Sequence, residues 1–478
     1  MALLWILAAA TIVHVVLDNR QPAKTMAWIL VILFVPLVGV VLYFFFGVSH
    51  RKERLISQRS LDQLTKRSML GFVEQPNLSV PEEHKRLVDL FVNQNLALPF
   101  RLDGTEFLSD GYSFFSQLLQ DIGRARSHIH IEMYIIEDDP LGRLVADVLA
   151  DKVRQGVEVR LIYDDVGCWR VGRRFFEQLR ERGVEVGVCL PVRFPSFTSK
   201  ANYRNHRKLV VIDGEVGYIG GMNVALRYVK GIRIGGKEKG DTGLLPWRDL
   251  MVRMTGIAVY AMQRAFLVDW YFVDRTLITD RRYYPPTPIP HHPSPVTPLA
   301  QIVTSGPMAR YPEIMQGYVH AIMAARRYVY IETPYFMPND PVLFALKTAA
   351  LAGVDVRLMI PQKSDTILPH LGTLSYLRDV LQAGVKVYRY KKGFLHSKLM
   401  VSDDALVSVG STNMDFRSFE HNFEVNAFVC DKQLASDMKR VFIQDQADSE
   451  QVSLKEWKKR PWWERLIEGT VRLMAPLL

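Results

Sequence analysis

Apolar residues fall into two patterns along the chain: long uninterrupted runs near the amino terminus, and short runs separated by amphipathic stretches after it. Residues 1–17 contain no Asp, Glu, Lys or Arg, and the 23 residues 26–48 contain no ionisable side chain except Tyr43. A run of this length can cross the hydrocarbon core of a bilayer, which is about 30 Å thick. The two runs therefore predict two transmembrane helices.

The polar residues around these runs predict their orientation. Residues 18–25 form a short polar turn, so the two helices are expected to be antiparallel neighbours. A cleaved signal peptide is the alternative for the first run, but this run lacks a basic start and a small-x-small cleavage site. Six Lys and Arg residues follow the second run within residues 51–67, against two in the turn. This asymmetry predicts a multi-pass membrane protein whose long carboxyl-terminal part lies in the cytoplasm.

The short apolar runs recur in the same order in two copies. Each copy has a buried strand with one glutamate inside it (Glu132 or Glu332), then a helix-like stretch, then a second apolar strand. Strand, helix, strand is typical of parallel α/β layering, and the period is too long for a solenoid. The chain is therefore expected to be an α/β protein with a duplicated lobe. The strands are 130–135 and 157–162 in the first copy, and 330–336 and 354–360 in the second.

A proline-rich segment separates the two copies. Seven of the fourteen residues 285–298 are proline, a composition that resists helix and sheet and favours an extended linker, although an insertion loop is the alternative. Six segments are therefore predicted. They are two transmembrane helices in 1–50, a basic juxtamembrane segment in 51–100, a first lobe in 101–284, the linker in 285–298, a second lobe in 299–450 and an amphipathic tail in 451–478.

Reactive side chains recur at one spacing in both copies. The pattern His-x-Lys-x4-Asp-x6-Gly-x2-Asn occurs twice, and the two histidines are 396 minus 206, or 190, residues apart. A lone histidine is most often a core residue, but agreement at five fixed positions, found twice, argues against that interpretation. The two copies are His206, Lys208, Asp213, Gly220, Asn223 and His396, Lys398, Asp403, Gly410, Asn413.

Two histidines and two lysines brought together make a site for transfer of a phosphodiester group. Imidazole can attack phosphorus or carry a proton near neutral pH. Ammonium and carboxamide groups hold phosphate oxygens, which is the role expected of Lys208, Lys398, Asn223 and Asn413.

The remaining motif positions are expected to support this chemistry. Asp213 and Asp403 are included among the catalytic residues, and orienting the motif is the role that we expect of them. Ser411 offers a hydroxyl that Gly221, at the same place in the first copy, cannot offer. This difference indicates either a firmer grip on the phosphate in the second copy or a difference in packing.

Composition narrows the partners and ligands. Lys and Arg outnumber Asp and Glu by 60 to 50, and the net charge of +10 favours an anionic partner, either lipid or nucleic acid.

The three cysteines are far apart and have no histidine at ligand spacing, so neither a disulfide framework nor a zinc site is indicated. No acidic cluster accompanies either motif. No metal or other cofactor is therefore expected to be obligatory, since the two lysines can take a metal's place.

The paired His-Lys-Asp motifs resemble those of the phospholipase D superfamily over residues 100–445. With the amino-terminal hairpin, which contains Arg20-Gln21-Pro22-Ala23 and Pro36-Leu37-Val38-Gly39, the chain is similar to the bacterial cardiolipin synthases of this superfamily. The resemblance implies two α/β lobes that meet at one active site. It also implies conversion of two phosphatidylglycerol molecules into cardiolipin and glycerol, by phosphatidyl transfer through an enzyme-bound intermediate.

The resemblance also implies individual roles. The two motifs are nearly symmetric, so the sequence does not by itself identify the nucleophile; family precedent favours His206, with His396 as acid and base. A histidine that attacks through one nitrogen needs its other nitrogen held by a carboxylate or a carbonyl. Glu424 matches the family partner expected for His396, and Asp249 is the partner proposed for His206.

The carboxyl-terminal tail also predicts contact with lipid. Several basic residues lead into Pro461, and apolar residues from Trp463 to Met474 recur at roughly helical spacing, as in a helix that lies on a membrane. A helix packed on its own domain is the alternative. Phosphatidylglycerol and anionic membrane lipid are the expected partners.

Other activities share these motifs. A hydrolytic phospholipase D lets water replace the lipid hydroxyl, and a phosphatidylserine synthase uses a different donor and acceptor; the motifs leave this choice open. A nuclease would share the histidines and the basic charge, but the membrane hairpin argues against nucleic acid. A lipid-binding protein with relic motifs is disfavoured, because both copies retain every reactive residue.

Overall fold

The structure is a computed structural model of the 478-residue chain, in which residues 2–18, 22–47, 60–66, 78–192, 202–233, 244–286 and 298–475 are described. The predicted proline-rich linker, residues 285–298, lies almost entirely outside these residues.

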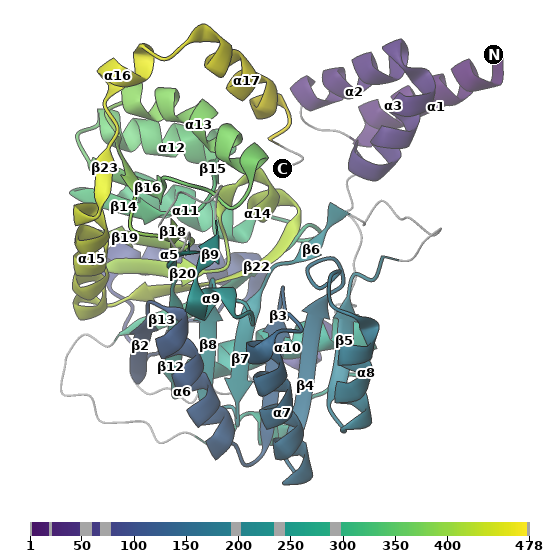
Figure 1. The fold of residues 1–478 in the computed structure, drawn as a ribbon, viewed down its shortest axis with the longest axis vertical. Helices are drawn as coiled ribbons and strands as arrows, with labels where there is room; N and C mark the ends of the chain where they lie inside the picture. Colours follow the sequence, from purple (N-terminus) through teal and green to yellow (C-terminus); the bar gives the residue numbers. More distant parts are fainter. Residues whose placement is uncertain are drawn as a thin grey trace.

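A mixed β-sheet forms the centre of the first lobe (Figure 1). Its strand order is β2-β12-β8-β7-β3-β4-β5. β3, β4 and β5 are parallel, whereas β7, β8, β12 and β2 follow one another antiparallel on the other side of β3. The strands are β2 (Gly104–Leu108), β3 (His128–Met133), β4 (Glu158–Asp164), β5 (Glu185–Cys189), β7 (Lys208–Ile212), β8 (Val216–Gly220) and β12 (Met251–Thr255).

The sheet of the second lobe repeats this order as β13-β22-β20-β19-β14-β16-β17, with β1 and β23 added at its edges. β14, β16 and β17 are parallel, as are their counterparts β3, β4 and β5. The predicted duplication and the predicted strands are therefore confirmed. The strands are β1 (Phe100–Arg101), β13 (Leu299–Ser305), β14 (Tyr328–Glu332), β16 (Asp355–Pro361), β17 (Lys386–Tyr390), β19 (Leu399–Ser402), β20 (Leu406–Gly410), β22 (Asn422–Cys430) and β23 (Ser449–Gln451).

Helices cover both sheets and also fill the space between them. α10 and α15 contact the inner faces of the sheets, where one hydrophobic core combines residues of both lobes, such as Leu209 and Phe266 with Leu399 and Val425. The outer helices cover a separate core in each lobe. The helices are α6 (Gly111–Arg124), α7 (Pro140–Arg154), α8 (Arg173–Glu181) and α10 (Val259–Asp274) in the first lobe, and α11 (Glu313–Ala324), α12 (Asp340–Leu351), α13 (Ile367–Gln382) and α15 (Lys432–Ala447) in the second.

Aspartates fix where several of these helices begin. The Asp139 carboxylate accepts hydrogen bonds from Leu141 N at 3.0 Å and Gly142 N at 2.8 Å, with Pro140 in the first turn of α7. Asp110 and Asp431 cap α6 and α15 in the same way. These caps satisfy amide groups that the first helical turn leaves without partners.

The amino-terminal apolar runs form a group of helices beside the two lobes (Figure 1). The first run is α1 (Ala2–Asp18). The second was expected to be one helix but is divided into α2 (Pro22–Phe34), α3 (Pro36–Leu42) and the π-helix η1 (Tyr43–Gly47). The division falls at Pro36, which has no amide hydrogen and whose ring opposes a continuous helix. Among the described residues, no helix combines the length and apolar composition needed to cross a membrane.

Segments at both ends of the lobes pack on the second lobe. α5 (Glu82–Asn95) lies in the predicted juxtamembrane segment and contacts α11 and β13. In the predicted tail, α16 (Leu454–Lys458) is followed by α17 (Trp462–Leu473), which lies along α13. Arg472 of α17 forms an ion pair with Asp379 at 2.8 Å. The tail is thus a helix packed on its own domain, with several apolar side chains left exposed.

Candidate active site

Short strands that pair across the two lobes bring the motifs together. β6 (Arg204–Asn205) of the first lobe pairs in parallel with the start of β22 in the second. β11 (Trp247–Arg248) of the first lobe pairs in parallel with β18 (Phe394–Leu395) of the second. The motif histidines directly follow β6 and β18, so each histidine lies at the contact between the lobes.

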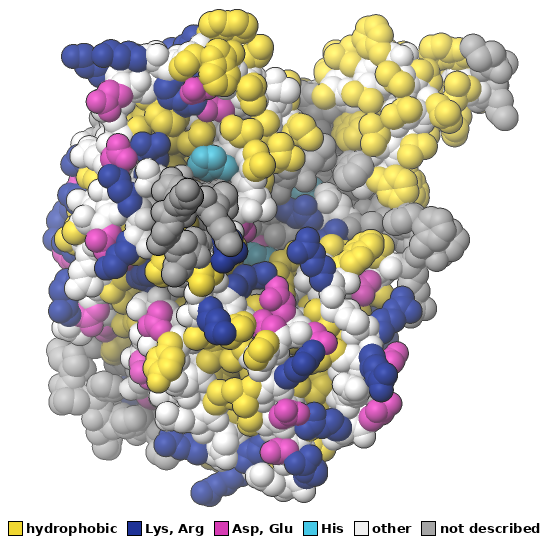
Figure 2. All heavy atoms as spheres, in the orientation of Figure 1, with side chains coloured by type: hydrophobic (Ala, Val, Ile, Leu, Met, Phe, Trp, Pro, Cys, Tyr) yellow, Lys and Arg dark blue, Asp and Glu magenta, His cyan; other side chains and the backbone are white. Residues whose placement is uncertain are grey.

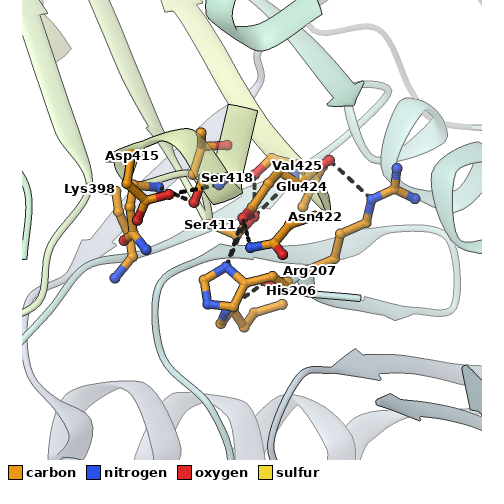
Figure 3. Close-up of polar contacts among 12 residues, drawn as sticks. His206, Arg207, Lys398, Ser411, Asp415, Ser418, Asn422, Glu424 and Val425 are labelled. Carbon is orange, nitrogen blue, oxygen red and sulfur yellow. Dashed lines mark hydrogen bonds and ion pairs between the residues drawn. The ribbon is translucent and has the colours of Figure 1, made fainter. Parts of the chain in front are cut away.

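His206 is held by a carboxylate of the second lobe (Figure 3). Its Nδ1 lies 2.9 and 3.1 Å from the two carboxylate oxygens of Glu424. Glu424 is fully buried and also accepts hydrogen bonds from Ser411 Oγ and from Asn422 Nδ2, the latter at 3.1 Å. Since a carboxylate only accepts, His206 Nδ1 carries the hydrogen and the Nε2 lone pair is left for chemistry.

His396 is held in the same way by a carboxylate of the first lobe. Its Nδ1 lies 2.6 Å from Asp249 Oδ2, and the Leu250 amide donates to Asp249 Oδ1 at 2.8 Å. A Cβ atom at Gly221 would lie 2.1 Å from that Oδ1. Gly221 therefore leaves room for Asp249, whereas Ser411 in the second copy donates a hydrogen bond to Glu424.

The predicted carboxylate partners are the right residues with the wrong histidines. Glu424 was expected to hold His396 and Asp249 to hold His206, but Glu424 holds His206 and Asp249 holds His396. The crossing follows from the strand pairing, because β22 runs beside β6 and β11 beside β18.

The two lysines are buried beside the histidines. Lys208 Nζ donates to the backbone oxygen of His206 at 2.6 Å, and Lys398 Nζ donates to that of His396 and lies 2.8 Å from its Nδ1. Burial lowers the pKa of Lys398 to about 8, with Asp249 opposing this shift. Burial also lowers the pKa of Lys208 well below its ordinary value, and the charge of Lys398 adds to that effect. This mutual repulsion places the two motifs in one electrostatic site.

Both histidines are neutral at neutral pH. Burial lowers the pKa of His206 to about 4, although Glu424 opposes it. Burial also lowers the pKa of His396 to about 4, and the Lys398 charge acts in the same direction. An anionic ligand between the lysines would offset their charge and raise both values.

Asp213 and Asp403 orient the motif strands rather than face the histidines. Asp213 follows β7 with a φ of 54°, and its carboxylate accepts hydrogen bonds from three consecutive backbone amides, residues 126–128, at 2.8 to 2.9 Å. Asp403 has a φ of 53° and binds residues 326–328 in the same way. Four residues lie between each aspartate and its lysine, so that the two are about 16 Å apart along the extended chain.

The two motif asparagines differ in their surroundings. Asn223 Oδ1 accepts from Ile135 N at 3.0 Å, and its Nδ2 donates to Tyr228 Oη at 2.7 Å, so this side chain ties loops of the first lobe together. Asn413 is buried, and its Oδ1 has no hydrogen-bond partner among the described residues. Asn413 therefore retains hydrogen-bonding capacity that Asn223 has used.

A buried arginine beside each histidine was not anticipated from the sequence. Arg207 forms an ion pair with Asp269 of α10 and donates to Glu424 O at 3.0 Å. Arg248 forms an ion pair with Asp445 of α15 at 2.8 Å. Each ion pair is beside one of the strand glutamates, Glu132 and Glu332, whose pKa values are raised by burial and by the neighbouring aspartate. The signal in the sequence was position: Arg207 lies inside the first motif and Arg248 directly precedes Asp249.

At the contact between the lobes lie two imidazoles and two ammonium groups. Each imidazole is held by a carboxylate of the other lobe. One imidazole Nε2 can attack phosphorus while the other carries a proton. Across the described ranges, no group of three or more His, Cys, Asp or Glu side chains is placed to hold a metal ion.

Comparison with known families gives two matches along the chain. The family described as cardiolipin synthase, phospholipase D-like domain, matches residues 118–231 and 318–446, which contain both motifs. The family described as phospholipase D-nuclease N-terminal matches residues 3–47.

Individual relatives extend over nearly the whole chain. The major cardiolipin synthase ClsA of Bacillus subtilis is 37% identical over 477 residues, covering 96% of this chain and 95% of the relative. The cardiolipin synthase of Oceanobacillus iheyensis is 38% identical, covering 98% and 97%. The crystal structure of the phosphatidylserine synthase of Haemophilus influenzae has the same fold, with a TM-score of 0.61 and 15% identity over 83% of this chain and 100% of that one. The chain therefore belongs to the cardiolipin synthase family of the phospholipase D superfamily.

Proposed function

We propose that this chain transfers the phosphatidyl group of one phosphatidylglycerol to the terminal hydroxyl of another, giving cardiolipin and glycerol. The observation that carries the proposal is the pair of crossed histidine–carboxylate contacts, His206 with Glu424 and His396 with Asp249. Two imidazoles, each held by a carboxylate where the lobes meet, suit a reaction with two successive displacements at phosphorus.

In the first step His206 Nε2 attacks the phosphorus of the donor lipid. The bond from phosphorus to the glycerol oxygen breaks, and His396 gives its proton to that oxygen, so that glycerol leaves and a phosphatidyl-histidine remains. His396 must be protonated for this step, although its pKa in the free protein is about 4. Binding of the anionic phosphodiester beside Lys398 raises that pKa and favours proton uptake with the substrate.

In the second step His396, now neutral, takes the proton of the acceptor's terminal hydroxyl. The acceptor oxygen bonds to phosphorus, the bond from phosphorus to His206 breaks, and cardiolipin is released. Lys208 and Lys398 are placed to hold the phosphate oxygens in both steps, where attraction to the growing negative charge contributes most to rate.

Membrane attachment belongs to the same proposal. α1, α2 and α3 expose large apolar side chains, and so does α17, for example Phe34 (81%), Trp462 (69%) and Leu473 (83%). Figure 2 shows hydrophobic side chains gathered over the amino-terminal helices and over α17 on the same side of the molecule. We infer that the amino-terminal helices anchor the chain in the inner membrane with the lobes in the cytoplasm, and that α17 rests on the lipid surface.

The test is an assay of lipid products. Detergent-purified protein is incubated with labelled phosphatidylglycerol and EDTA, beside His206→Ala and His396→Ala variants, and the lipids are resolved by mass. Cardiolipin with an equal amount of glycerol, abolished in both variants, is the expected result. Phosphatidic acid alone would identify a hydrolase, and phosphatidylserine formed only when serine and a nucleotide-activated lipid are supplied would identify the other transferase.

A further inference from the structure

Cardiolipin synthesis needs a place for a second phosphate, an inference that rests on the proposed function. The acceptor lipid carries its own phosphodiester, separated from its reactive hydroxyl by the three carbons of its glycerol. While that hydroxyl attacks the phosphatidyl-histidine, the second negative charge lies one glycerol length from the first. Two phosphodiesters this close repel each other unless cations hold the second one as well.

Arg204 lies close to His206 along the chain. It precedes His206 by two residues in the extended segment that contains β6. Alternate residues of an extended segment face the same side, and two residues span about 6.6 Å. Asn205 points to the other side, where its Nδ2 donates to the buried carboxylate of Glu132 at 2.5 Å. Arg204 and His206 therefore share the side that faces the site.

Arg417 of the second lobe lies beside Arg204. Its Nη2 donates to Asn202 O at 3.0 Å, while Arg204 Nη1 donates to the next carbonyl, that of Tyr203. Burial lowers the pKa of Arg204, and repulsion by the charge of Arg417 is the second cause. Two guanidinium groups, one from each lobe, are thus held near one another by two consecutive carbonyl groups.

Tyr134 connects this arginine pair to the reacting groups. Its ring lies 4.9 Å from that of His206, and Lys208 Nζ lies 5.3 Å from its centre. The charges of Arg417 and Arg204 both act on the phenol, opposing the rise in pKa that burial causes. Lys208 and the two arginines are therefore neighbours of one aromatic ring, which also contacts His206.

Among carboxylates, Asp164 exerts the largest electrostatic effect on Arg204. Its oxygens bind backbone amide groups. They accept hydrogen bonds from the amides of Asn205 at 2.8 Å, Val166 at 3.0 Å and Gly167 at 2.8 Å. Burial raises its pKa to about 6, which still leaves this carboxylate largely ionised at neutral pH. Asp164 thus positions the backbone before His206, and its charge, like that of Asp165, partly offsets the charge of Arg204.

We propose that Arg204 and Arg417 form a second anion subsite that binds the phosphodiester of the acceptor lipid while its hydroxyl attacks at His206. Guanidinium groups suit this role because they bind phosphate oxygens in pairs. The subsite selects an acceptor that carries a phosphodiester over water or a neutral alcohol.

The test compares two soluble acceptors on the full-length protein. Labelled phosphatidylglycerol in detergent micelles is the donor, and the acceptors are glycerol and glycerophosphoglycerol, the deacylated headgroup that carries a phosphodiester. The wild-type protein is expected to prefer glycerophosphoglycerol by about tenfold or more at equal concentration. The preference is expected to fall close to one in Arg204→Gln and in Arg417→Gln. Arg180→Gln serves as the matched control and is expected to keep the preference. It removes an exposed arginine of α8 that donates to the Val186 carbonyl of β5.

Either of two results overturns the subsite: a wild-type protein that uses both acceptors equally, or glutamine variants that keep the wild-type preference. The wild-type comparison decides even if a variant fails to fold. A wild-type protein that transfers the label to neither acceptor, and forms no cardiolipin, contradicts the proposed function itself and the subsite with it.

Discussion

Each imidazole at this site is supported by a carboxylate from the opposite lobe. His206 of the first lobe is held by Glu424, and His396 of the second by Asp249. Neither lobe alone contains a complete pair, so the tautomer of each histidine depends on contact between the lobes. Loss of a carboxylate that fixes a tautomer can slow an enzyme by about 10⁴-fold.

The crossed pairs allow the nucleophile to be identified by substitution. A donor with a p-nitrophenol leaving group needs no proton from an acid, because p-nitrophenolate leaves unaided. With this donor, Glu424→Gln is expected to slow p-nitrophenol release by about a thousandfold, since His206 loses its tautomer. Asp249→Asn is expected to slow it far less, although with phosphatidylglycerol both variants are slow. The reverse order of the two variants would make His396 the nucleophile.

The buried lysine predicts how activity depends on pH. The pKa of Lys398 is about 8, so the charged form dominates below this pH and is lost as the pH rises through it. If the charge holds the phosphate, its loss adds a further fall in kcat/KM above about pH 8, beyond the fall that loss of the His396 proton causes at lower pH. In Lys398→Arg the cation stays charged, and the residual activity is expected to lack this fall. A limb near pH 8 that persists in Lys398→Arg would assign the titration to another group.

At the scale of elements, strands and helices followed from local patterns, whereas the site depended on contacts that no local pattern contains. The strands that carry Glu132 and Glu332 were both predicted. The crossing was not, because β6, β11 and β18 have two residues each and exist only through pairing with the other lobe. Hydrophobic periodicity also could not locate the break at Pro36 inside a uniformly apolar run.

Buried ion pairs between elements are expected to matter for stability. Arg207→Ala leaves Asp269 of α10 as a buried charge without its partner, a change that costs about 3–5 kcal/mol. The expected result is a clear fall in Tm, measured by thermal unfolding of the purified protein. Arg143→Ala breaks the exposed pair with Asp138 and is expected to leave Tm unchanged. Equal Tm values in the two variants would show that the Arg207 pair contributes no more than a surface pair.

At the scale of the whole molecule, the two lobes share one hydrophobic core, and exposed apolar side chains gather on one side of the molecule. The core between the sheets contains buried residues of both copies, so the lobes are expected to fold as a unit rather than separately. The apolar side chains of α17 and of the amino-terminal helices lie on one side of this unit (Figure 2). This arrangement favours a site that receives lipid from an adjacent bilayer.

Contact between α17 and lipid can be measured by fluorescence. In vesicles that contain brominated phosphatidylglycerol, bromine quenches tryptophans that reach the lipid. Trp462→Phe together with Trp463→Phe is expected to reduce the quenched fraction, because both side chains are more than half exposed. Trp270→Phe removes a buried tryptophan of α10 and is the control. An unchanged quenched fraction in the double variant would place α17 away from the membrane.

The central claim is that phosphatidyl transfer proceeds in two displacements through a histidine. The most direct test is the stereochemical course at phosphorus, followed with phosphatidylglycerol whose phosphate is chiral through sulfur substitution. Each in-line displacement inverts the configuration, so two displacements predict cardiolipin with retained configuration. Inverted configuration would mean that the acceptor hydroxyl attacks the donor directly, and it would contradict the phosphatidyl-histidine intermediate.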